Sequence, residues 1–352
     1  MQAARSQLPY VQVLRAVAAL VVAFLHTEQA AGAFAGRPGE SPFPWLKPLP
    51  WEAGVDIFFV ISGFVMVWSS MRLFGRRQGA RLFLGRRIAR IVPLYWLTTT
   101  AVVLLGLTVP GALSEPLGDD WRYIAASYLF IPWLRPDGYI QPAFRLGWTL
   151  NYEMLFYVIF CLFLPFQRRV AVCGVCGVIA LLALIGWTVP LGSPQLVFWT
   201  DPIVLEFAFG VLLGYIAVEG AVLAAPWRAL LVAMAIVLFW LNPIEYRVVR
   251  PISYGIPAAL LVAAAVFAPA GRISAWTRSW VVLGDASYAL YLAHPFPMRA
   301  LREVWMRMHL IGSLGIFSYI VVSVGASCAL SVGINAWFER PATRTARQFL
   351  RA

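Results

Sequence analysis

Hydrophobic residues in this chain fall into long runs instead of alternating with polar ones. Runs of near-spanning length recur from one end of the sequence to the other, and few charged residues interrupt them. A transmembrane helix needs about 20 predominantly apolar residues. In lipid only helices and closed barrels satisfy every backbone group, so runs of this length predict helices. The pattern therefore predicts an all-α polytopic membrane protein.

We predict a bundle of about ten transmembrane helices. Their ranges are 10–28, 52–70, 88–107, 148–166, 170–189, 199–217, 227–241, 252–268, 285–305 and 312–337. Segment 121–134 is apolar but short, and it is predicted to be an interfacial or re-entrant helix. We expect one integral-membrane domain over residues 9–341, followed by a short basic cytoplasmic tail over 342–352.

The composition supports this class of protein. The chain has 352 residues, of which 61% are hydrophobic and 12% charged, and its mean hydropathy is +0.75. A soluble domain has about 25% charged residues. The net charge of +12 first indicates topology in a membrane protein. No basic block with interleaved aromatic residues lies in a soluble region, so we expect no nucleic-acid partner.

The distribution of basic residues predicts the orientation of the chain. With the N-terminus inside, most of the 28 Lys and Arg residues fall in cytoplasmic segments, notably around 72–90 and 340–351. Both termini are therefore predicted to be cytoplasmic. The long connection 108–147 is then outside, and it contains four acidic residues, Glu115, Asp119, Asp120 and Asp137.

The first predicted helix contains two ionisable residues, Arg15 and His26, in the stretch LRAVAALVVAFLHT. Their spacing places them about 20° apart around the helix and about 16 Å apart along it, so they share one face. Ionisable groups within a span usually mark a functional site. The segment also resembles a secretory signal peptide, and Arg15 could instead snorkel to the interface of an ordinary first span.

On the predicted topology, His26, Asp56 and Glu153 come from three helices and lie in one layer near the outer side. A histidine beside carboxylates is the arrangement that a general base needs, because the carboxylate orients the imidazole and stabilises its cation. Hydrogen bonds that only hold the helices together are the structural alternative. His294 should lie near mid-membrane, where Pro295 disturbs the helix; a role in the site and a role in the kink remain open.

Arg87 and Arg90 form a second candidate site at the inner entry of the third predicted helix. At positions i and i+3 they point to one side. Arginine binds phosphate oxygens with a planar fork, so a phosphorylated cytosolic ligand could dock here. Anchoring to anionic lipid is the alternative. We expect a good part of the roughly 30 Å hydrocarbon core to separate this pair from the outer layer.

The cysteines indicate no metal site and no disulfide framework. Cys173 and Cys176 form a CxxC pair, but inside an apolar run and without a second pair or a nearby histidine. Small apolar packing residues are the better interpretation.

Six motifs in order resemble the acyltransferase-3 family of membrane acyltransferases. They are Leu14-Arg15-Ala16 with His26, Gly54-Val55-Asp56 with Phe58-Phe59 and Ser62-Gly63-Phe64, Arg87-x-x-Arg90 before Pro93-Tyr95-Trp96, Trp148-Thr149-Leu150 with Glu153 and Phe156-Tyr157, Ser287-Tyr288 with Tyr291-Leu292 and His294-Pro295, and Glu339-Arg340-Pro341. The residues of these motifs look closest to those of the exopolysaccharide O-acetyltransferase branch.

The resemblance implies a multi-pass enzyme of the bacterial inner membrane. It implies transfer of an acyl group, commonly acetyl, from cytosolic acyl-CoA as co-substrate to a carbohydrate or lipid-linked glycan, with no permanently bound cofactor. Membrane lipid and polysaccharide-assembly proteins are the further partners that we expect. Some members add a C-terminal esterase-like domain; we expect transfer here to finish within the bundle or on a separate partner.

The resemblance also implies roles for particular residues. Arg15, Arg87 and Arg90 would bind acyl-CoA, and His26, Asp56 and Glu153 would be catalytic. Trp148, Tyr291 and His294 are candidates to line the acceptor site. His26 would act as general base or form a covalent acyl intermediate, and the sequence does not separate these mechanisms. A transporter that uses the buried ionisable residues is the rival from another class, although its inverted repeats are not evident.

Overall fold

The structure is a computed structural model. It describes residues 8–36, 39–43, 50–109, 117, 120–135, 137–241, 250–269, 271, 274–310 and 312–351. Across these ranges the regular elements are helices, and extended backbone pairs only in an isolated antiparallel bridge between Leu134 and Ile140. The prediction of an all-α membrane protein is confirmed. Glu115 and Asp119, predicted to lie outside the membrane, fall outside the described residues.

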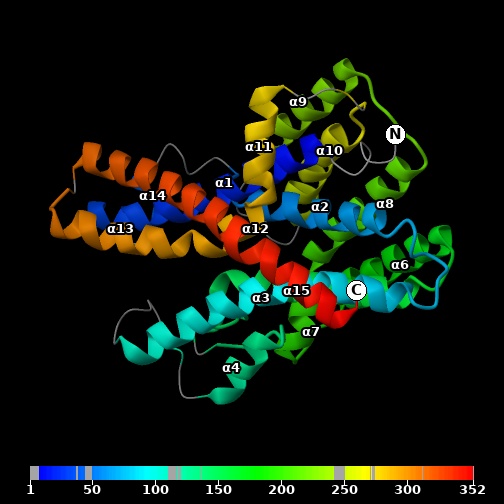
Figure 1. Cartoon of the computed structure of the whole chain (residues 1–352), viewed down its shortest axis with the longest axis horizontal. Coiled ribbons are helices and arrows are strands. Elements are labelled where there is room, and N and C mark those ends of the chain that lie inside the picture. Colours follow the sequence, from blue (N-terminus) through cyan, green and yellow to red (C-terminus); the bar gives the residue numbers. More distant parts are fainter. Residues whose placement is uncertain are drawn as a thin grey trace. The chain divides into compact units, whose positions relative to one another are not determined.

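Figure 1 shows the helices of the described residues, most of them labelled. They are α1 (Pro9–Ala31), α2 (Ala53–Ser69), α3 (Gly79–Thr108), α4 (Trp121–Tyr128), α5 (Trp148–Phe163), α6 (Arg168–Thr188), α7 (Pro194–Trp199), α8 (Leu205–Val218), α9 (Ala225–Leu241), α10 (Ile256–Val266), α11 (Ala275–Asp285), α12 (Ser287–Ala293), α13 (Pro295–Arg307), α14 (Ser313–Ile334) and α15 (Arg340–Leu350). Single-turn elements precede α8, α10 and α15: η5 (Pro202–Val204), η7 (Pro251–Gly255) and η8 (Asn335–Glu339).

Nine of the ten predicted spans correspond to apolar helical segments. Among the described residues, six segments are long and apolar enough to cross a membrane: Pro9–Phe34, Gly79–Thr108, Arg145–Phe163, Arg168–Thr188, Pro194–Val218 and Ser313–Leu350. Shorter apolar helices at Ala53–Ser69, Ala225–Leu241 and Pro251–Val266 match three more. The predicted tail 342–352 lies mostly within α15, which extends the last span as a helix to Leu350.

The remaining predicted span, 285–305, is broken into α12 and α13 at His294. Pro295 follows directly and has no N–H to continue the helical hydrogen bonds, so the kink expected there is present. Two other segments differ from the prediction. Helix α11 occupies a stretch predicted to be a connection, and α4 ends at Tyr128, whereas a helix was predicted through residue 134.

Helix α3 begins at Gly79, although the span was predicted to begin near residue 88. Three arginines and two leucines, which are good helix formers, supply five of the nine residues in the added stretch 79–87. Arginines argue against a position in lipid but not against a helix, so the helix extends past the apolar run. Arg87 therefore lies about 12 Å along α3 from the first residue of the helix, and its place at the inner entry of the span stays a prediction.

The described chain forms two compact units, and α2 contributes to both of them. The first comprises Met1–Ile61 and Ile216–Phe338, and the second comprises Ser62–Tyr215 and Glu339–Ala352. In the first unit, α1 packs against α11, α12, α13 and α14 (Figure 1). Small residues make this close packing possible. Ala16, Ala19 and Ala23 recur at helical spacing and are fully buried.

Glycines bring α2 close to its neighbour within each unit. A Cβ on Gly54 would lie 2.6 Å from the carbonyl oxygen of Ala18 on α1. In the second unit, a Cβ on Gly63 would lie 2.1 Å from the carbonyl oxygen of Phe207 on α8. Both distances are far below van der Waals contact, so only glycine permits these approaches.

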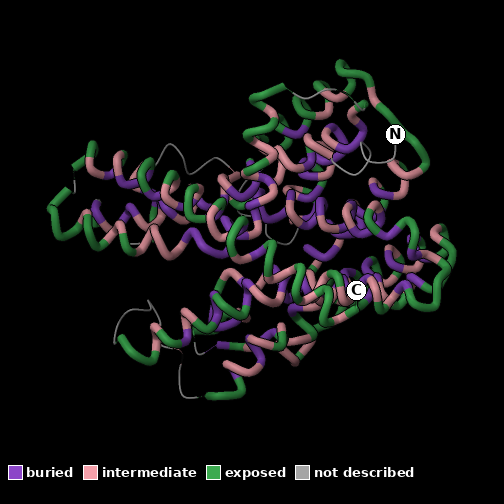
Figure 2. Tube along the Cα trace, in the orientation of Figure 1, coloured by how far each residue is buried: buried purple, intermediate pink, exposed green. Residues whose placement is uncertain are grey.

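The exposed surface carries many large apolar side chains, as expected in lipid. In α9, Ala235 is the one fully buried residue, and Figure 2 shows most of this helix as exposed or half-buried. Trp240 and Leu241 are 69% and 70% exposed. A monomeric soluble protein rarely exposes so continuous an apolar face.

Candidate functional site

His26 and His294 are directly hydrogen-bonded in the first unit. Nδ1 of His26, on α1, lies 2.9 Å from Nε2 of His294, at the break between α12 and α13. His294 is fully buried, and its Nδ1 lies 3.1 Å from the carbonyl oxygen of Leu290. Tyr291, one turn earlier, is buried and packs its ring edge-on against Phe58. The helix break thus places a second imidazole against the predicted base.

Arg15 lies on the same continuous helix as His26, so the expected spacing on one face holds. Its guanidinium donates to Oε1 of Gln12 at 3.2 Å. Both Arg15 and His26 are half-buried, which fits side chains that line an interior instead of facing lipid.

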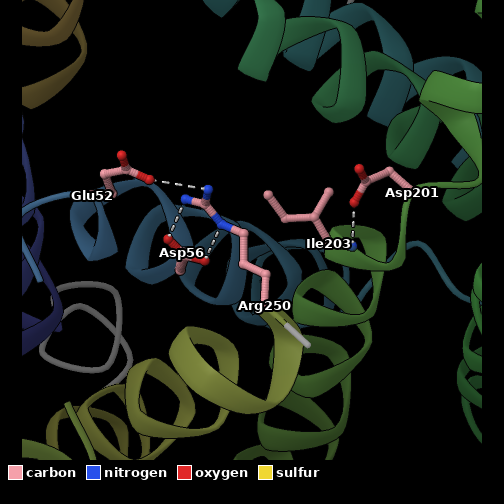
Figure 3. A network of polar contacts seen from close by, with 5 residues as sticks. All are labelled: Glu52, Asp56, Asp201, Ile203 and Arg250. Atoms are coloured by element: carbon pink, nitrogen blue, oxygen red, sulfur yellow. Dashed lines mark hydrogen bonds and ion pairs between the residues drawn. The ribbon is translucent and has the colours of Figure 1, made fainter. Parts of the chain in front are cut away.

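Asp56 is held by Arg250 in a bidentate ion pair (Figure 3). Nε and Nη2 of Arg250 each donate to one carboxylate oxygen at 2.9 Å, and Nη1 lies 3.5 Å from Glu52. The side chain of Asp56 is 0% exposed and that of Arg250 16%. A buried carboxylate needs such a partner, because an unpaired charge is costly away from water.

Glu153 accepts two hydrogen bonds on one oxygen in the second unit. Ser62, on α2, donates to Oε1 at 2.9 Å, and the hydroxyl of Tyr157 donates to the same oxygen. Tyr157 is one turn along α5 from Glu153 and is fully buried. All three residues come from the motifs GVDIFFVISGF and GWTLNYEMLFY, so the two motifs form one hydrogen-bonded group.

Arg87 is the centre of a cationic cluster in the same unit. Its guanidinium donates to Ser69 at the end of α2 and lies over the ring of Phe83, with 5.5 Å from Cζ to the ring centroid. Arg90 and Arg347 are within electrostatic range of Arg87. Arg347 belongs to α15, which packs along α3 (Figure 1), so a residue from the C-terminal helix joins the predicted pair.

The expected separation between Glu153 and the arginine pair is wrong. Glu153 is within electrostatic range of Arg87. Both residues bind to α2: Ser62 donates to Glu153, and Arg87 donates to Ser69. Seven residues of helix span about 10 Å, well short of most of the hydrocarbon core. The separation was inferred from the predicted depth of each residue along its own span, and the structure instead joins both residues to α2.

Trp148 begins α5 in the second unit and is half-buried. Its ring meets that of Tyr152 at 84°, with centroids 5.9 Å apart, and Tyr152 stacks on Phe198 at 3.9 Å. The aromatic cluster holds Trp148 in place. Its role at an acceptor site stays a prediction.

The candidate residues therefore divide into two groups. Arg15, His26, Asp56, Tyr291 and His294 lie in the first unit, and Arg87, Arg90, Trp148 and Glu153 lie in the second. The predicted layer that combines His26 with both carboxylates stays a prediction. Among the described residues, no three His, Cys, Asp or Glu side chains gather as metal ligands.

Three further polar residues were not singled out from the sequence. Arg250 precedes a predicted apolar span, where an arginine is ordinary, and only the fold shows its carboxylate partner. Glu28 and Glu206 are buried within apolar helices, and Ser41 donates to Glu28. An acidic residue inside a span is a functional candidate, so the two glutamates could have been found by that rule.

Comparisons with known proteins agree with the resemblance to the acyltransferase-3 family. A family model described as an acyltransferase domain, that of the acyltransferase-3 family, matches residues 8–332. The exopolysaccharide production protein ExoZ of Rhizobium meliloti (strain 1021) is 32% identical over 301 residues, which is 84% of this chain and 90% of that protein. Acyltransferase MdmB of Streptomyces mycarofaciens is 27% identical over 270 residues, which is 68% of this chain and 66% of that protein. No solved structure matches.

The family match and the membrane architecture of the chain agree with each other. The family match covers nearly all of the described helices, and the relatives' similarity extends over most of the chain. The apolar helices of this chain make it a multi-pass membrane protein. This chain belongs to the acyltransferase-3 family of membrane acyltransferases.

Proposed function

We propose that this acyltransferase uses acyl-CoA, with acetyl-CoA as the simplest donor, to acylate a hydroxyl of a carbohydrate. An exopolysaccharide or its lipid-linked precursor is the proposed acceptor, and the bacterial inner membrane is the proposed location. The acceptor class is supported by ExoZ, which is named for exopolysaccharide production. Family membership favours this enzyme over the transporter considered from the sequence.

The arginine cluster is the observation that supports acyl-CoA as the donor. Arg87, Arg90 and Arg347 come together from α3 and α15, and Arg86 is also within electrostatic range of Arg347. Like charges repel, so an anion that binds among these guanidinium groups is electrostatically favoured. The phosphates of CoA supply several negative charges, and planar guanidinium groups bind phosphate oxygens with two parallel hydrogen bonds.

Glu153 connects the cluster to the motif residues on α2 and α5. Oε1 is already occupied by Ser62 and Tyr157, and no other described residue forms a hydrogen bond to Oε2. The carboxylate is therefore fixed in orientation with one oxygen available. We assign Glu153 to the orientation of substrate near the donor, within reach of an acyl-pantetheine arm that starts at Arg87.

Transfer then needs one proton acceptor. His26 takes the proton of the acceptor hydroxyl, and the hydroxyl oxygen attacks the carbonyl carbon of the thioester. The carbon–sulfur bond breaks, and the CoA thiolate leaves and takes the proton from His26. An acyl-His26 intermediate would split the same transfer into two steps.

Purified protein supplied with acetyl-CoA and a panel of glycans tests this function. We expect free CoA thiol to appear only with a suitable acceptor, together with an acetyl ester on that acceptor by mass spectrometry. Thiol release that is independent of every glycan, or uptake of glycan by proteoliposomes without release of CoA, would contradict the proposal.

The donor site is tested by a charge-conserving change. Arg90→Lys keeps the charge but loses the planar fork, and hydrogen bonds between charged groups contribute about 1.5–3 kcal/mol. We expect acetyl-CoA to bind about tenfold more weakly or worse. Arg347→Lys should also weaken binding, whereas Arg76→Lys, in the exposed turn after α2, is the matched control. Equal and small effects at all three positions would make the arginines lipid anchors.

A further inference from the structure

The hydrogen bonds of His294 determine where its proton lies. A backbone carbonyl oxygen only accepts hydrogen bonds, so Nδ1 of His294 must carry the hydrogen that it shares with Leu290. A neutral imidazole has one N–H, and Nε2 of His294 is then an acceptor. The alternative is an imidazolium with both nitrogens protonated. His294 is 0% exposed, and a charge without a counter-ion is disfavoured at such a position.

The proton of His26 follows from that of His294. Nε2 of His294 accepts, so Nδ1 of His26, 2.9 Å away, must donate. The two ring planes lie within 7° of each other and the ring centroids are 5.1 Å apart. That separation is close to the nitrogen–nitrogen distance plus two ring radii, so the rings lie edge to edge in almost one plane. The N–H of His26 therefore points along the lone pair of His294, as a strong hydrogen bond requires.

The remaining nitrogen of His26 is Nε2, which has the lone pair in this tautomer. We propose that His294 is a positioning residue that fixes His26 in its Nδ1–H tautomer and so presents Nε2 as the base that receives the acceptor's proton. The proposal rests on the proposed function for the identity of that proton, but the tautomer itself can be measured without substrate.

The same arrangement suits the protonated state. When Nε2 of His26 takes a proton, its Nδ1–H already points at His294, so no hydrogen bond has to be exchanged during transfer. The imidazolium also donates more strongly than the neutral ring, so the bond to His294 strengthens as charge develops. When Nε2 gives its proton to the leaving thiolate, the starting tautomer is restored. His294 thus has the place that a carboxylate was predicted to have.

Nitrogen NMR of histidine-labelled protein in lipid measures the tautomers directly. The chain contains three histidines. The third, His309, has a backbone φ of 56°, so His309→Asn removes its signals with a residue that tolerates that conformation. We expect both His26 and His294 to be neutral with the hydrogen on Nδ1. In His294→Leu, the preference of His26 for Nδ1–H should disappear. A wild-type His26 with its hydrogen on Nε2 would overturn the proposal, whatever the enzyme transfers.

Three substitutions at position 294 separate positioning from packing. Glutamine places an amide near the site of Nε2 and can still accept from His26. Asparagine reaches only the site of Nδ1 and keeps the bond to Leu290, and leucine keeps neither. We expect kcat to fall on the order of 10²-fold or more in His294→Leu and His294→Asn, with KM for acetyl-CoA little changed, because His26 then loses the hydrogen bond that both orients its ring and keeps Nε2 unprotonated. His294→Gln should recover most of kcat.

The alternative outcomes are distinct. If His294→Asn recovered kcat and His294→Gln did not, the bond to Leu290 would be the important one, and His294 would only hold the helix break. If the NMR result held but no variant changed kcat, the tautomer would be as proposed, but transfer would not depend on His294. That result would contradict the positioning role of His294, whereas the role of His26 in the proposed function is tested separately by His26→Gln.

Discussion

Removal of Arg250 should destabilise the first unit more than removal of its partner Asp56. Asp56 is 0% exposed and both of its oxygens bind Arg250 at 2.9 Å, so Arg250→Met leaves a buried carboxylate without its bidentate partner. Losing one partner of a buried pair costs about 3–5 kcal/mol. Asp56→Leu leaves Arg250, which is partly exposed and also contacts Glu52 at 3.5 Å. We expect the smaller cost of a lost charged hydrogen bond, about 1.5–3 kcal/mol.

The double variant Asp56→Leu/Arg250→Met gives the sharpest test. Apolar residues that replace both members of a buried ion pair are often neutral or stabilising. The double variant should therefore be more stable than Arg250→Met alone, which makes the two changes strongly non-additive. Reversible unfolding in mixed micelles, followed by tryptophan fluorescence, measures all four proteins. Losses that simply add, or equal losses in the two single variants, would refute the reasoning from burial.

The same double variant separates structure from chemistry at Asp56. If the ion pair only stabilises the fold, the folded double variant should transfer acetyl groups at close to the normal rate. If Asp56 acts on substrate or on His26, the double variant should fold but lose transfer.

Three other predictions test the base, the packing and the topology. His26→Gln keeps polarity but cannot accept a proton near neutral pH, so transfer should fall about 10²–10⁴-fold with acetyl-CoA binding retained; His309→Asn is the control, and near-normal turnover would contradict a base. Gly63→Ala forces a Cβ to within 2.1 Å of a carbonyl oxygen and should lower the free energy of unfolding by about 1–3 kcal/mol, whereas Gly177→Ala, with nothing within 4 Å, should not; equal stability would contradict the close approach. In a variant without its four native cysteines, a cysteine at Arg344 should react only from the cytoplasm and one at Asp120 only from outside. The reverse pattern would overturn the predicted orientation.

Long apolar runs predicted the membrane helices well because lipid leaves the backbone few alternatives. They placed the start of α3 too late, because charged residues mark the limit of an apolar run and not the limit of a helix. Arg87 also lies closer to Glu153 than expected, because Ser69 and Ser62 of α2 bind the two residues. The motif residues His26, Asp56, Glu153 and Arg87 are buried or half-buried polar groups, and such residues stand out within apolar sequence; their roles stay predictions.

The partners of these residues could not be predicted from spacing. Arg250 and Asp56 are 194 residues apart, and His26 and His294 are 268 apart, so only the packing of distant helices brings each pair together. Arginine at the start of a span and histidine before a proline both have ordinary structural explanations. The sequence alone gives no reason to pair Arg250 with one particular carboxylate, or His294 with one particular imidazole.

Arg347 lies outside the part of the chain that the family model matches, but it belongs to the arginine cluster. The family match ends at residue 332, before η8 and α15, yet α15 lies along α3 and brings a guanidinium to Arg86 and Arg90. A chain shortened to the matched region would keep the first five motifs but lose Glu339-Arg340-Pro341 and the guanidinium of Arg347. Relatives that differ in this last helix would then differ in how tightly they hold the proposed donor.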